Sequence, residues 1–381
     1  MEANDVVSDV AGKALRMPSG YWAFIPTSLP PNLDLNPLAI SLSAADAALS
    51  ELSGLGRILP NPHLLIAPYV NREAVASSQI EGTQADLSDL FLDEAAPERT
   101  SAESDVLEVR NYVAAMEVGL ELLRELPIAG RLVRRLHAVL LREVEGQERL
   151  PGKFRRSQNW IRGSGPQDAL YVPPPPDRLA DCLSDWERFV NRRDLLPPLV
   201  QCAVMHQAFE TIHPFLDGNG RIGRLLITLF LIERGRLSQP LLYLSSHIER
   251  TKPEYYERLQ RVRTHGDWLG WIGYFLDAVT RTATGAMRHA DALLALRDDL
   301  RNRPQLHSKH RAQNLVDLLF SNPYVTIPRS AKLLGVAEPT ADRSIKLLES
   351  IGVLREITGR NYGRVWVADP VREAIANAPP A

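Results

Sequence analysis

Residues 213–224 have the sequence HPFLDGNGRIGR, and this stretch decides how the rest of the chain is interpreted. Pro214 disfavours helical geometry at the residue before it, so the preceding helix should end at His213. The glycines of the loop 217–220 permit positive φ and the close approach of a ligand to the backbone. Arg221 then begins a second helix. The sequence therefore predicts a helix, a tight loop and a second helix whose start faces the loop.

The start of that second helix is a candidate anion-binding site. Its free N–H groups and the positive end of its dipole face the loop. Arg221 and Arg224 are three residues apart, so they share a helix face and can reach one polyphosphate. Asp217 supplies a carboxylate that could hold a phosphate-bound Mg²⁺. His213 has an ordinary pKa suited to taking a proton from a hydroxyl at neutral pH. Together these groups predict transfer of a phosphorus-centred group to a hydroxyl, catalysed by positioning and charge.

Each member of this set also has an ordinary structural interpretation. A histidine at a helix end is commonly a cap, and an Asp-Gly-Asn-Gly turn commonly lies at the surface. Two arginines one turn apart commonly form a solvated helix face. Because all of these features occur together within residues 213–224, the catalytic interpretation is favoured.

The composition is that of a globular protein from a reducing compartment. Of the 381 residues, 45% are hydrophobic and 24% charged, and the net charge of -2 gives no global attraction to nucleic acid or anionic membrane. The only cysteines, Cys182 and Cys202, fall in apolar helical patterns, so we expect no disulfide scaffold. Residues 1–17 lack the basic start and apolar run of a signal peptide. The apolar stretch 225–235 is too short to span a bilayer. We therefore expect a cytoplasmic protein that does not bind membranes.

Helical periodicity dominates from about Ser41 onward, and three stretches interrupt it. Residues 1–35 predict an irregular, proline-bearing and extended arm, packed by Tyr21, Trp22 and Phe24. The acidic, small-residue stretch 92–104 predicts a linker, and residues 151–176 predict a β-hairpin because two extended runs flank a Gly/Pro/Asp turn. We expect three parts: residues 1–100 with the arm and first helices, residues 101–300 with a helical core, and residues 305–370 with a separate unit.

The last unit has a winged-helix pattern of three short helices followed by two strands. Residues 306–369 contain nine Lys/Arg and six Asp/Glu. The candidate recognition helix carries two cations, Arg343 and Lys346, but also the acids Glu338, Asp342 and Glu349. Contact with DNA phosphates calls for a denser basic face. Protein contact or simple packing is therefore favoured over DNA binding.

The stretch 213–224 resembles the motif of the Fic family, His-x-Phe-x-Asp/Glu-Gly-Asn-Gly-Arg-x-x-Arg, and matches it at every specified position. The resemblance extends to EVRNY at 108–112, to the segment 154–176, and to a Tyr-Tyr pair at 255–256. It implies an all-α fold in which a Fic-type helical core carries a β-hairpin flap, joined here to the winged-helix (α+β) domain. It also implies an enzyme, a nucleotidyltransferase that moves AMP from ATP to Ser, Thr or Tyr hydroxyls of target proteins and of itself.

The same resemblance implies roles for individual residues. His213 would be the general base and Asp217 the ligand of an Mg²⁺ cofactor, while Phe215 would pack in the core and hold the loop. The implied ATP-binding residues are Asp217, Gly218, Asn219, Gly220, Arg221, Ile222, Gly223, Arg224, Tyr255 and Tyr256. Among them, Asn219 and Gly220 would help bind the transferred phosphate, and the two arginines the outer phosphates. The tyrosines would lie near the adenosine, although helix packing explains them equally well.

The predicted hairpin would act as a flap for the target protein. By resemblance, Ala169, Leu170, Tyr171 and Val172 would position the target's side chain by strand addition. The intact Gly-Asn-Gly-Arg form of the motif, with Gly218, favours AMP transfer, because relatives that transfer phosphoryl or phosphocholine groups tend to depart from it.

A second segment, residues 77–82, has the sequence SSQIEG. On a helix Ser77 and Glu81 are one turn apart and Gly82 is a natural stop, so spacing alone predicts a polar helix end. The segment also resembles the inhibitory Ser/Thr-x-x-x-Glu-Gly/Asn motif of the Fic family. By that likeness Glu81 would pair with Arg224, and ATP would bind in an unproductive pose.

Two other functions remain open at this point. The same site could remove AMP from a modified protein, with Glu81 positioning water. Alternatively, the chain could be a DNA-binding regulator whose Fic core senses a nucleotide, although the intact His213 favours catalysis over sensing. A homodimer is also compatible with the sequence.

Overall fold

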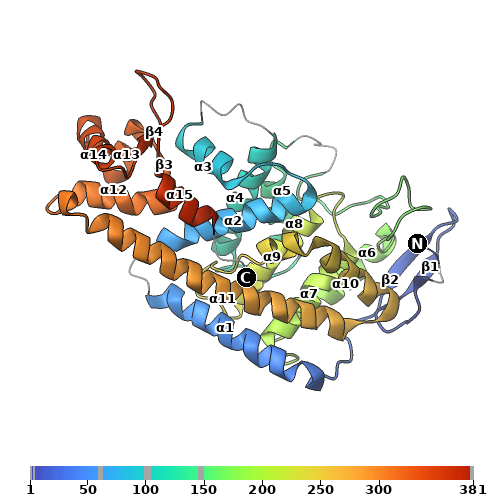
Figure 1. The fold of residues 1–381 in the computed structure, drawn as a ribbon. Helices are drawn as coiled ribbons and strands as arrows, with labels where there is room; N and C mark the ends of the chain where they lie inside the picture. Colours follow the sequence, from blue (N-terminus) through green and yellow to red (C-terminus); the bar gives the residue numbers. More distant parts are fainter. Residues whose placement is uncertain (1, 3–4, 59–62, 98–103, 145–149, 378–381) are drawn as a thin grey trace.

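The structure, a computed structural model, describes the whole chain except residues 1, 3–4, 59–62, 98–103, 145–149 and 378–381 (Figure 1). The described part is mostly helical, as predicted, and contains two small antiparallel sheets, one of two strands and one of three. Long helices form the body of the molecule, and the C-terminal unit lies at one end of it.

The two helices that flank the motif are α7 (Pro198–Ile212) and α8 (Asn219–Glu233), and they lie in the middle of the core. Every residue of α7 from Leu199 onward is buried, as are most residues of α8. Helix α7 packs against α6 (Leu179–Asn191), while α8 packs against helices from the N-terminal half. Apolar residues occur on all sides of both helices because neighbours cover them, and polar side chains such as Glu210 and Arg224 are buried among them.

The N-terminal half supplies five helices around this centre. They are α1 (Ala39–Ile58), α2 (His63–Glu81), α3 (Leu87–Ala95), α4 (Ser104–Leu122) and α5 (Gly130–Leu140). Helices α2, α4 and α5 all contact α8. The first part of the predicted linker at 92–104 is helical, because α3 begins after a capping box at Asp86 and ends at Ala95. Residues 98–103 of the predicted linker lie outside the described residues.

The N-terminal arm is extended and packed by Phe24, as predicted, but residues 12–26 are regular rather than irregular. These residues form an antiparallel hairpin of β1 (Gly12–Arg16) and β2 (Trp22–Pro26). The turn depends on Gly20, whose φ of 90° suits a residue without a Cβ. Phe24 of β2 is buried, so the hairpin is tied to the body of the molecule.

The predicted hairpin at 151–176 is much narrower than expected. Its two arms meet at a single antiparallel bridge between Ile161 and Tyr171. Earlier in the segment, the Arg155 N–H donates to the carbonyl of Pro214 (2.9 Å) rather than to a neighbouring strand. Hydrogen-bonding groups of this segment thus bind the motif loop, and its two arms form no regular β-ladder.

Three helices follow the motif: α9 (Ser245–Arg250), α10 (Lys252–His265) and the long α11 (Trp268–Arg301). Helix α1 packs along α11 (Figure 1). By length and composition alone, one described helix, residues 36–57, could cross a membrane. In this fold Ala45, Leu49 and Leu52 of that helix are fully buried within the core.

The C-terminal unit contains the predicted three helices and hairpin, together with two elements that were not predicted. The three helices are α12 (His310–Ser321), α13 (Ile327–Leu334) and α14 (Glu338–Ser350), and the hairpin strands are β4 (Arg355–Glu356) and β5 (Trp366–Val367). The additional elements are β3 (Tyr324–Val325), which pairs with β5, and α15 (Asp369–Ala376), which packs on α11. Helix α12 packs on α2, so the unit is attached to the helical core.

Candidate active site

His213 ends α7, as predicted, and adopts a left-handed conformation with φ 50° and ψ 61°. Burial and the guanidinium groups of Arg263 and Arg155 lower the pKa of His213 to about 4. The imidazole is therefore neutral at pH 7. Its Nδ1 lies 3.4 Å from the carbonyl oxygen of Glu210, which can only accept, so Nδ1 carries the proton. This tautomer leaves the Nε2 lone pair able to accept a proton from a substrate.

Arg155 and Asn159 hold the motif loop by its main chain. The Arg155 Nε donates to the carbonyl of His213 (2.9 Å), and Nη2 donates to the carbonyl of Pro174 (2.5 Å). The Asn159 Nδ2 donates to the carbonyl of Phe215 (2.8 Å). Burial lowers the pKa of Arg155 to about 10, so it is still charged at pH 7. The sequence analysis missed this role, although both residues lie in the segment that resembles the Fic family.

His137 of α5 supports the loop from the other side. Its ring stacks on Phe215 with centroids 3.7 Å apart, and burial lowers its pKa to about 4. The neutral ring accepts from the Gly152 N–H at Nδ1 (2.8 Å) and so donates from Nε2 to the carbonyl of Asp217 (3.0 Å). The sequence carries no sign of this contact, because His137 lies within an amphipathic helix far from the motif.

The start of α8 presents unused N–H groups, as predicted. Gly218 precedes the helix with φ 73°, a conformation that favours glycine. The N–H groups of Asn219, Gly220 and Arg221 form no hydrogen bond with the described part of the chain. The side chain of Asn219 is engaged: it donates to the Phe215 carbonyl (2.9 Å) and accepts from the Phe215 N–H (2.8 Å). The contribution of Asn219 to anion binding is therefore its main-chain N–H, while its side chain closes the loop.

Arg224 is buried, and three of its five N–H groups donate hydrogen bonds to α2. Its Nε donates to the Ser77 hydroxyl (2.9 Å) and its Nη2 to the Ser77 carbonyl (2.9 Å). Nη2 also donates to Glu81 Oε1 at 2.6 Å. Burial alone would lower the pKa of Arg224, but the Glu81 carboxylate overcomes this effect and raises it. The structure thus brings together the two residues that the resemblance paired, and Gly82, with φ 114°, ends α2 directly after Glu81.

The Glu81 carboxylate also covers the start of α8. A Cβ placed on Gly220 would lie 2.3 Å from Glu81 Oε1 and 2.9 Å from Arg224 Nη1. A glycine at this position lets the carboxylate approach the helix backbone, where the free N–H groups and the helix dipole attract negative charge. The Glu81 carboxylate therefore lies against the first turn of α8 as well as against Arg224.

Arg221 has a different carboxylate partner, Glu108 of α4, which the sequence analysis missed. Its Nη1 donates to Glu108 Oε2 (2.7 Å), and its Nη2 lies 3.6 Å from Asp217. The Nε of Arg221 is buried and has no acceptor in the described part of the chain. Arg221 is thus held in place with donor capacity to spare, whereas the Nε of Arg224 is already occupied by Ser77.

Glu210 is a second buried carboxyl group near Arg224 that was not predicted. A Cβ on Gly223 would lie 2.3 Å from its Oε1, an oxygen that has no hydrogen-bond partner among the described residues. Burial raises the pKa of Glu210 to about 7, although the Arg224 guanidinium opposes this shift. Gly223 therefore faces this carboxyl group rather than the loop.

The side chains of the remaining residues predicted to bind ATP mostly pack within the protein. The side chain of Ile222 is fully buried in the core. Tyr255 is also buried, and its hydroxyl lies 2.8 Å from His206 Nε2. Tyr256 is half-buried, and its ring lies 5.3 Å from that of Tyr255. Helix packing therefore accounts for Tyr255, while Tyr256 retains an exposed portion.

The predicted flap exposes one side chain. Leu170 is 48% exposed, whereas Ala169, Tyr171 and Val172 are buried. The Tyr171 hydroxyl donates to the Thr211 carbonyl (2.7 Å), two residues before the motif. Strand addition at this segment would have to use its main chain, and the Val172 carbonyl already accepts from the Phe24 N–H of β2 (2.9 Å).

The structure places one carboxylate, rather than a cluster, at the candidate metal position. The described residues contain no group of three or more His, Cys, Asp or Glu side chains arranged to hold a metal ion. The Asp217 side chain is 34% exposed beside Arg221. Mg²⁺ is often held by one or two carboxylates together with substrate phosphates, so a single carboxylate fits that use.

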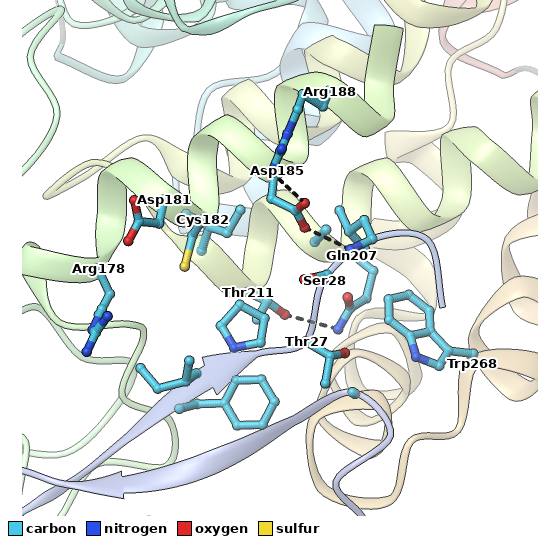
Figure 2. Close-up of a pocket in the computed structure, with 17 residues that line it drawn as sticks. Thr27, Ser28, Arg178, Asp181, Cys182, Asp185, Arg188, Gln207, Thr211 and Trp268 are labelled. Carbon is cyan, nitrogen blue, oxygen red and sulfur yellow. Dashed lines mark hydrogen bonds and ion pairs between the residues drawn. The ribbon is translucent and has the colours of Figure 1, made fainter. Parts of the chain in front are cut away.

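A separate cavity of about 280 Å³ lies behind the end of α7 (Figure 2). Segment 24–29, α6 and α7 line it, together with Trp268. Thr211 and Ile212 reach this cavity just before His213, but no residue of 213–224 lines it. The cavity is therefore distinct from the candidate active site.

Comparison with known proteins agrees with this geometry. Residues 40–121 match the Fic/DOC family N-terminal region and residues 127–231 match the Fic/DOC family. Protein adenylyltransferase Fic of Aedes aegypti is 33% identical over 152 residues, which are 38% of this chain and 28% of that protein. Protein adenylyltransferase Fic of Culex quinquefasciatus is 32% identical over 168 residues, which are 42% of this chain and 30% of that protein. The chain thus spans less than a third of the length of these two relatives.

The fold is also found in solved structures. The crystal structure of a Fic family protein from Desulfovibrio desulfuricans G20 matches with a TM-score of 0.56 at 20% identity. That match covers 89% of this chain and 98% of the other, so the shared fold includes most of the molecule. The motif, the matched regions and the fold together show that this chain belongs to the Fic/DOC family.

Proposed function

We propose that this protein transfers AMP from ATP to a hydroxyl of a Ser, Thr or Tyr side chain in a target protein, and that Glu81 holds the activity in check. The names of the relatives, protein adenylyltransferase Fic, support the first part. The observation that carries it is a neutral His213 imidazole at one end of the motif loop and, at the other end, a helix start with three N–H groups unused within the described chain. A base and an anion site side by side are what attack on a phosphorus centre requires.

In the proposed reaction, His213 Nε2 accepts the proton of the target hydroxyl. The hydroxyl oxygen bonds to the α-phosphorus of ATP, the bond between that phosphorus and the bridging oxygen breaks, and pyrophosphate leaves. The N–H groups at the start of α8 stabilise the oxygens of the transferred phosphate, and Arg221 and Arg224 bind the outer phosphates. Asp217 would hold Mg²⁺ together with those phosphates, and the ion supplies positive charge there when bound.

The proposed inhibition follows from the position of Glu81. Its carboxylate engages Arg224 and covers Gly220, so a phosphate would have to displace it from both. Arg224 is buried, and a charge-assisted hydrogen bond is strong when it is shielded from water. ATP would then settle with its outer phosphates away from Arg224, and its α-phosphorus would not lie in line with the target hydroxyl.

The test is mass spectrometry of purified Glu81→Gly protein and host lysate after incubation with Mg²⁺ and isotopically labelled ATP. We expect labelled AMP on Ser, Thr or Tyr of the protein itself and of a target. The matched control is Glu81→Gly combined with His213→Ala, which should show no label. Absence of label in both proteins would contradict the proposed transfer. Loss of AMP from a pre-modified protein, faster in wild type than in Glu81→Gly, would favour removal of AMP instead.

A further inference from the structure

The C-terminal unit contains a wide groove between the start of α12 and α14. Its volume is about 660 Å³. Its lining residues are Ser308, Lys309, His310, Arg311, Ala312, Thr340, Arg343, Ser344 and Leu347. The lining thus combines cations with hydroxyl groups and includes no acidic residue.

The three strong cations of this groove are not committed to protein carboxylates. Lys309, Arg311 and Arg343 are exposed. None of them forms an ion pair within the described part of the chain, and Arg343 Nε donates only to the Pro339 carbonyl of its own helix (3.1 Å). Exposed cations with no carboxylate partner favour an anionic ligand.

The acidic residues of α14 oppose phosphate binding less than the sequence suggests. Asp342 pairs with Lys346 at 2.7 Å, one turn along the same helix. Glu349 accepts a hydrogen bond from the Trp366 indole N–H (3.1 Å), inside the unit. Of the three acids on α14, only Glu338 is exposed without such a contact. The outer face of α14 is therefore more favourable to phosphate than its composition implied.

The loop between β4 and β5 supplies a second exposed region with the same chemistry. It projects from the unit (Figure 1) and contains Arg360, Tyr362 and Arg364. Tyr362 is 90% exposed, so its ring is accessible to a base. The Arg364 guanidinium lies over the Trp366 ring, and the exposed Arg360 and Tyr362 suit contact with nucleic-acid backbone and bases.

The unit attaches to the rest of the molecule through other surfaces. The Asn322 side chain donates to the Phe91 carbonyl (2.9 Å), and His289 of α11 lies 2.9 Å from the Ala374 carbonyl. Helix α12 packs on α2 and α11, and α15 packs on α11. Helix α14 and the loop between β4 and β5 lie at the end of the molecule away from α7 and α8 (Figure 1). Packing against the core thus leaves these basic surfaces uncovered.

We propose that the C-terminal unit binds double-stranded DNA through this groove and loop. Lys309, Arg311 and Arg343 contact phosphates, with help from the hydroxyls and from the N-terminus of the twelve-residue α12. The major groove of DNA admits one α-helix, and α14 follows α13 in the order found in helix-turn-helix units. The loop between β4 and β5 contacts the adjacent backbone.

The experiment measures binding of the full chain to a fluorescent DNA duplex of mixed sequence at several salt concentrations. Each phosphate contact contributes about -0.9 to the slope of log affinity against log salt, so five cations predict a slope of about -4 to -5. Lys309→Glu, Arg311→Glu and Arg343→Glu in one protein should reduce the slope by about 3 and weaken binding about a hundredfold or more at low salt.

The matched control is Lys13→Glu, Arg131→Glu and Arg135→Glu, which makes the same change in charge at exposed positions outside the unit. It should bind DNA within about threefold of wild type. Both triple variants should keep the thermal midpoint and the AMP-transfer activity of the parent protein, which separates this proposal from the proposed function. Should the groove variant fail to fold, Arg343→Gln alone should still reduce the slope by about 1.

Two results would overturn the proposal. One is no binding of duplex by wild type at low salt. The other is an equal loss of binding in the groove variant and the control, which would assign the attraction to overall charge. Arg360→Ala provides an independent check on the loop, because it should reduce the slope by about 1 without affecting the fold.

Discussion

The cations of the candidate active site and those of the C-terminal groove are arranged in opposite ways. Arg224 and Arg221 are buried and each is paired with a carboxylate, Glu81 at 2.6 Å and Glu108 at 2.7 Å. Lys309 and Arg311 of the groove are exposed and form no ion pair with the described residues. A buried guanidinium must be paired, because burying an unpaired charge costs free energy. An exposed guanidinium is solvated by water and needs no protein partner before a ligand binds. The candidate active site is therefore built from buried, paired cations, and the groove from exposed cations without carboxylate partners among the described residues.

The two active-site pairs also differ from each other. Glu81 lies against Gly220 in the first turn of α8, while the Arg221 Nε remains without an acceptor in the described chain. Glu81 comes from α2, which ends at that residue, and Glu108 comes from α4 within the core. We infer that Glu81 blocks the site and that Glu108 positions Arg221 for use.

The largest effect should come from His213→Ala. Loss of a general base costs about 10²–10⁴-fold in rate, so AMP transfer by Glu81→Gly protein should fall by that factor when His213 is also replaced. ATP binding by calorimetry and duplex binding should both be retained, since the imidazole contributes to neither. Transfer within a few-fold of the parent rate would remove His213 from the role of base.

Glu108→Ala should have a smaller effect than His213→Ala. It should lower the rate of AMP transfer, whereas Glu81→Gly should raise it. Removing the acceptor from buried Arg221 sacrifices a hydrogen bond between charged groups, which contributes about 1.5–3 kcal/mol. The kcat/KM for ATP should fall about tenfold or more, and Glu108→Gln, which keeps an acceptor oxygen, should lose less. A rise in rate for Glu108→Ala would show that Glu108 blocks the site as Glu81 does, and the distinction between the two pairs would fail.

Acid should destabilise the core through its buried histidines. Burial lowers the pKa of His137, His213 and His289 to about 4, and that of His206 to about 3. In the unfolded chain a histidine titrates near 6.5, so the unfolded state binds protons first as the pH falls. The stability that these neutral rings contribute is present above pH 6.5 and is lost as the pH falls towards 4.

The measurement for this prediction is the thermal midpoint between pH 8 and pH 4. It should fall by several degrees below pH 6.5, and His137→Gln should flatten the fall relative to its own value at pH 8. A midpoint that does not change between pH 6.5 and pH 4.5 would contradict the buried, neutral state of these rings.

The sequence predicted the parts of the site that depend on local order. Pro214 and Gly218 set the end of α7 and the start of α8, because proline and glycine restrict or release backbone angles at their own positions. The pairing of Glu81 with Arg224 came from family resemblance alone, since 143 residues separate the two. No spacing rule could have indicated it.

The rest of the site depends on contacts between distant segments. Glu108 meets Arg221 across 113 residues, and Arg155 meets the His213 carbonyl across 58. Both residues appear in the sequence as ordinary charged positions, because what they bind is decided by packing. For the same reason the hairpin at 151–176 was overestimated: its β-like pattern was correct, but its hydrogen-bonding groups are used by the motif loop.

The central claim is that Glu81 withholds Arg224 from ATP. The direct measurement is the initial rate of AMP incorporation at saturating ATP for wild type, Glu81→Gly, Arg224→Ala and the double variant. If the buried pair contributes about 1.5–3 kcal/mol, Glu81→Gly should be roughly 10- to 150-fold faster than wild type. The double variant should be slow again, because the gain depends on a free Arg224. A single variant no faster than wild type, or a double variant as fast as Glu81→Gly, would contradict the account.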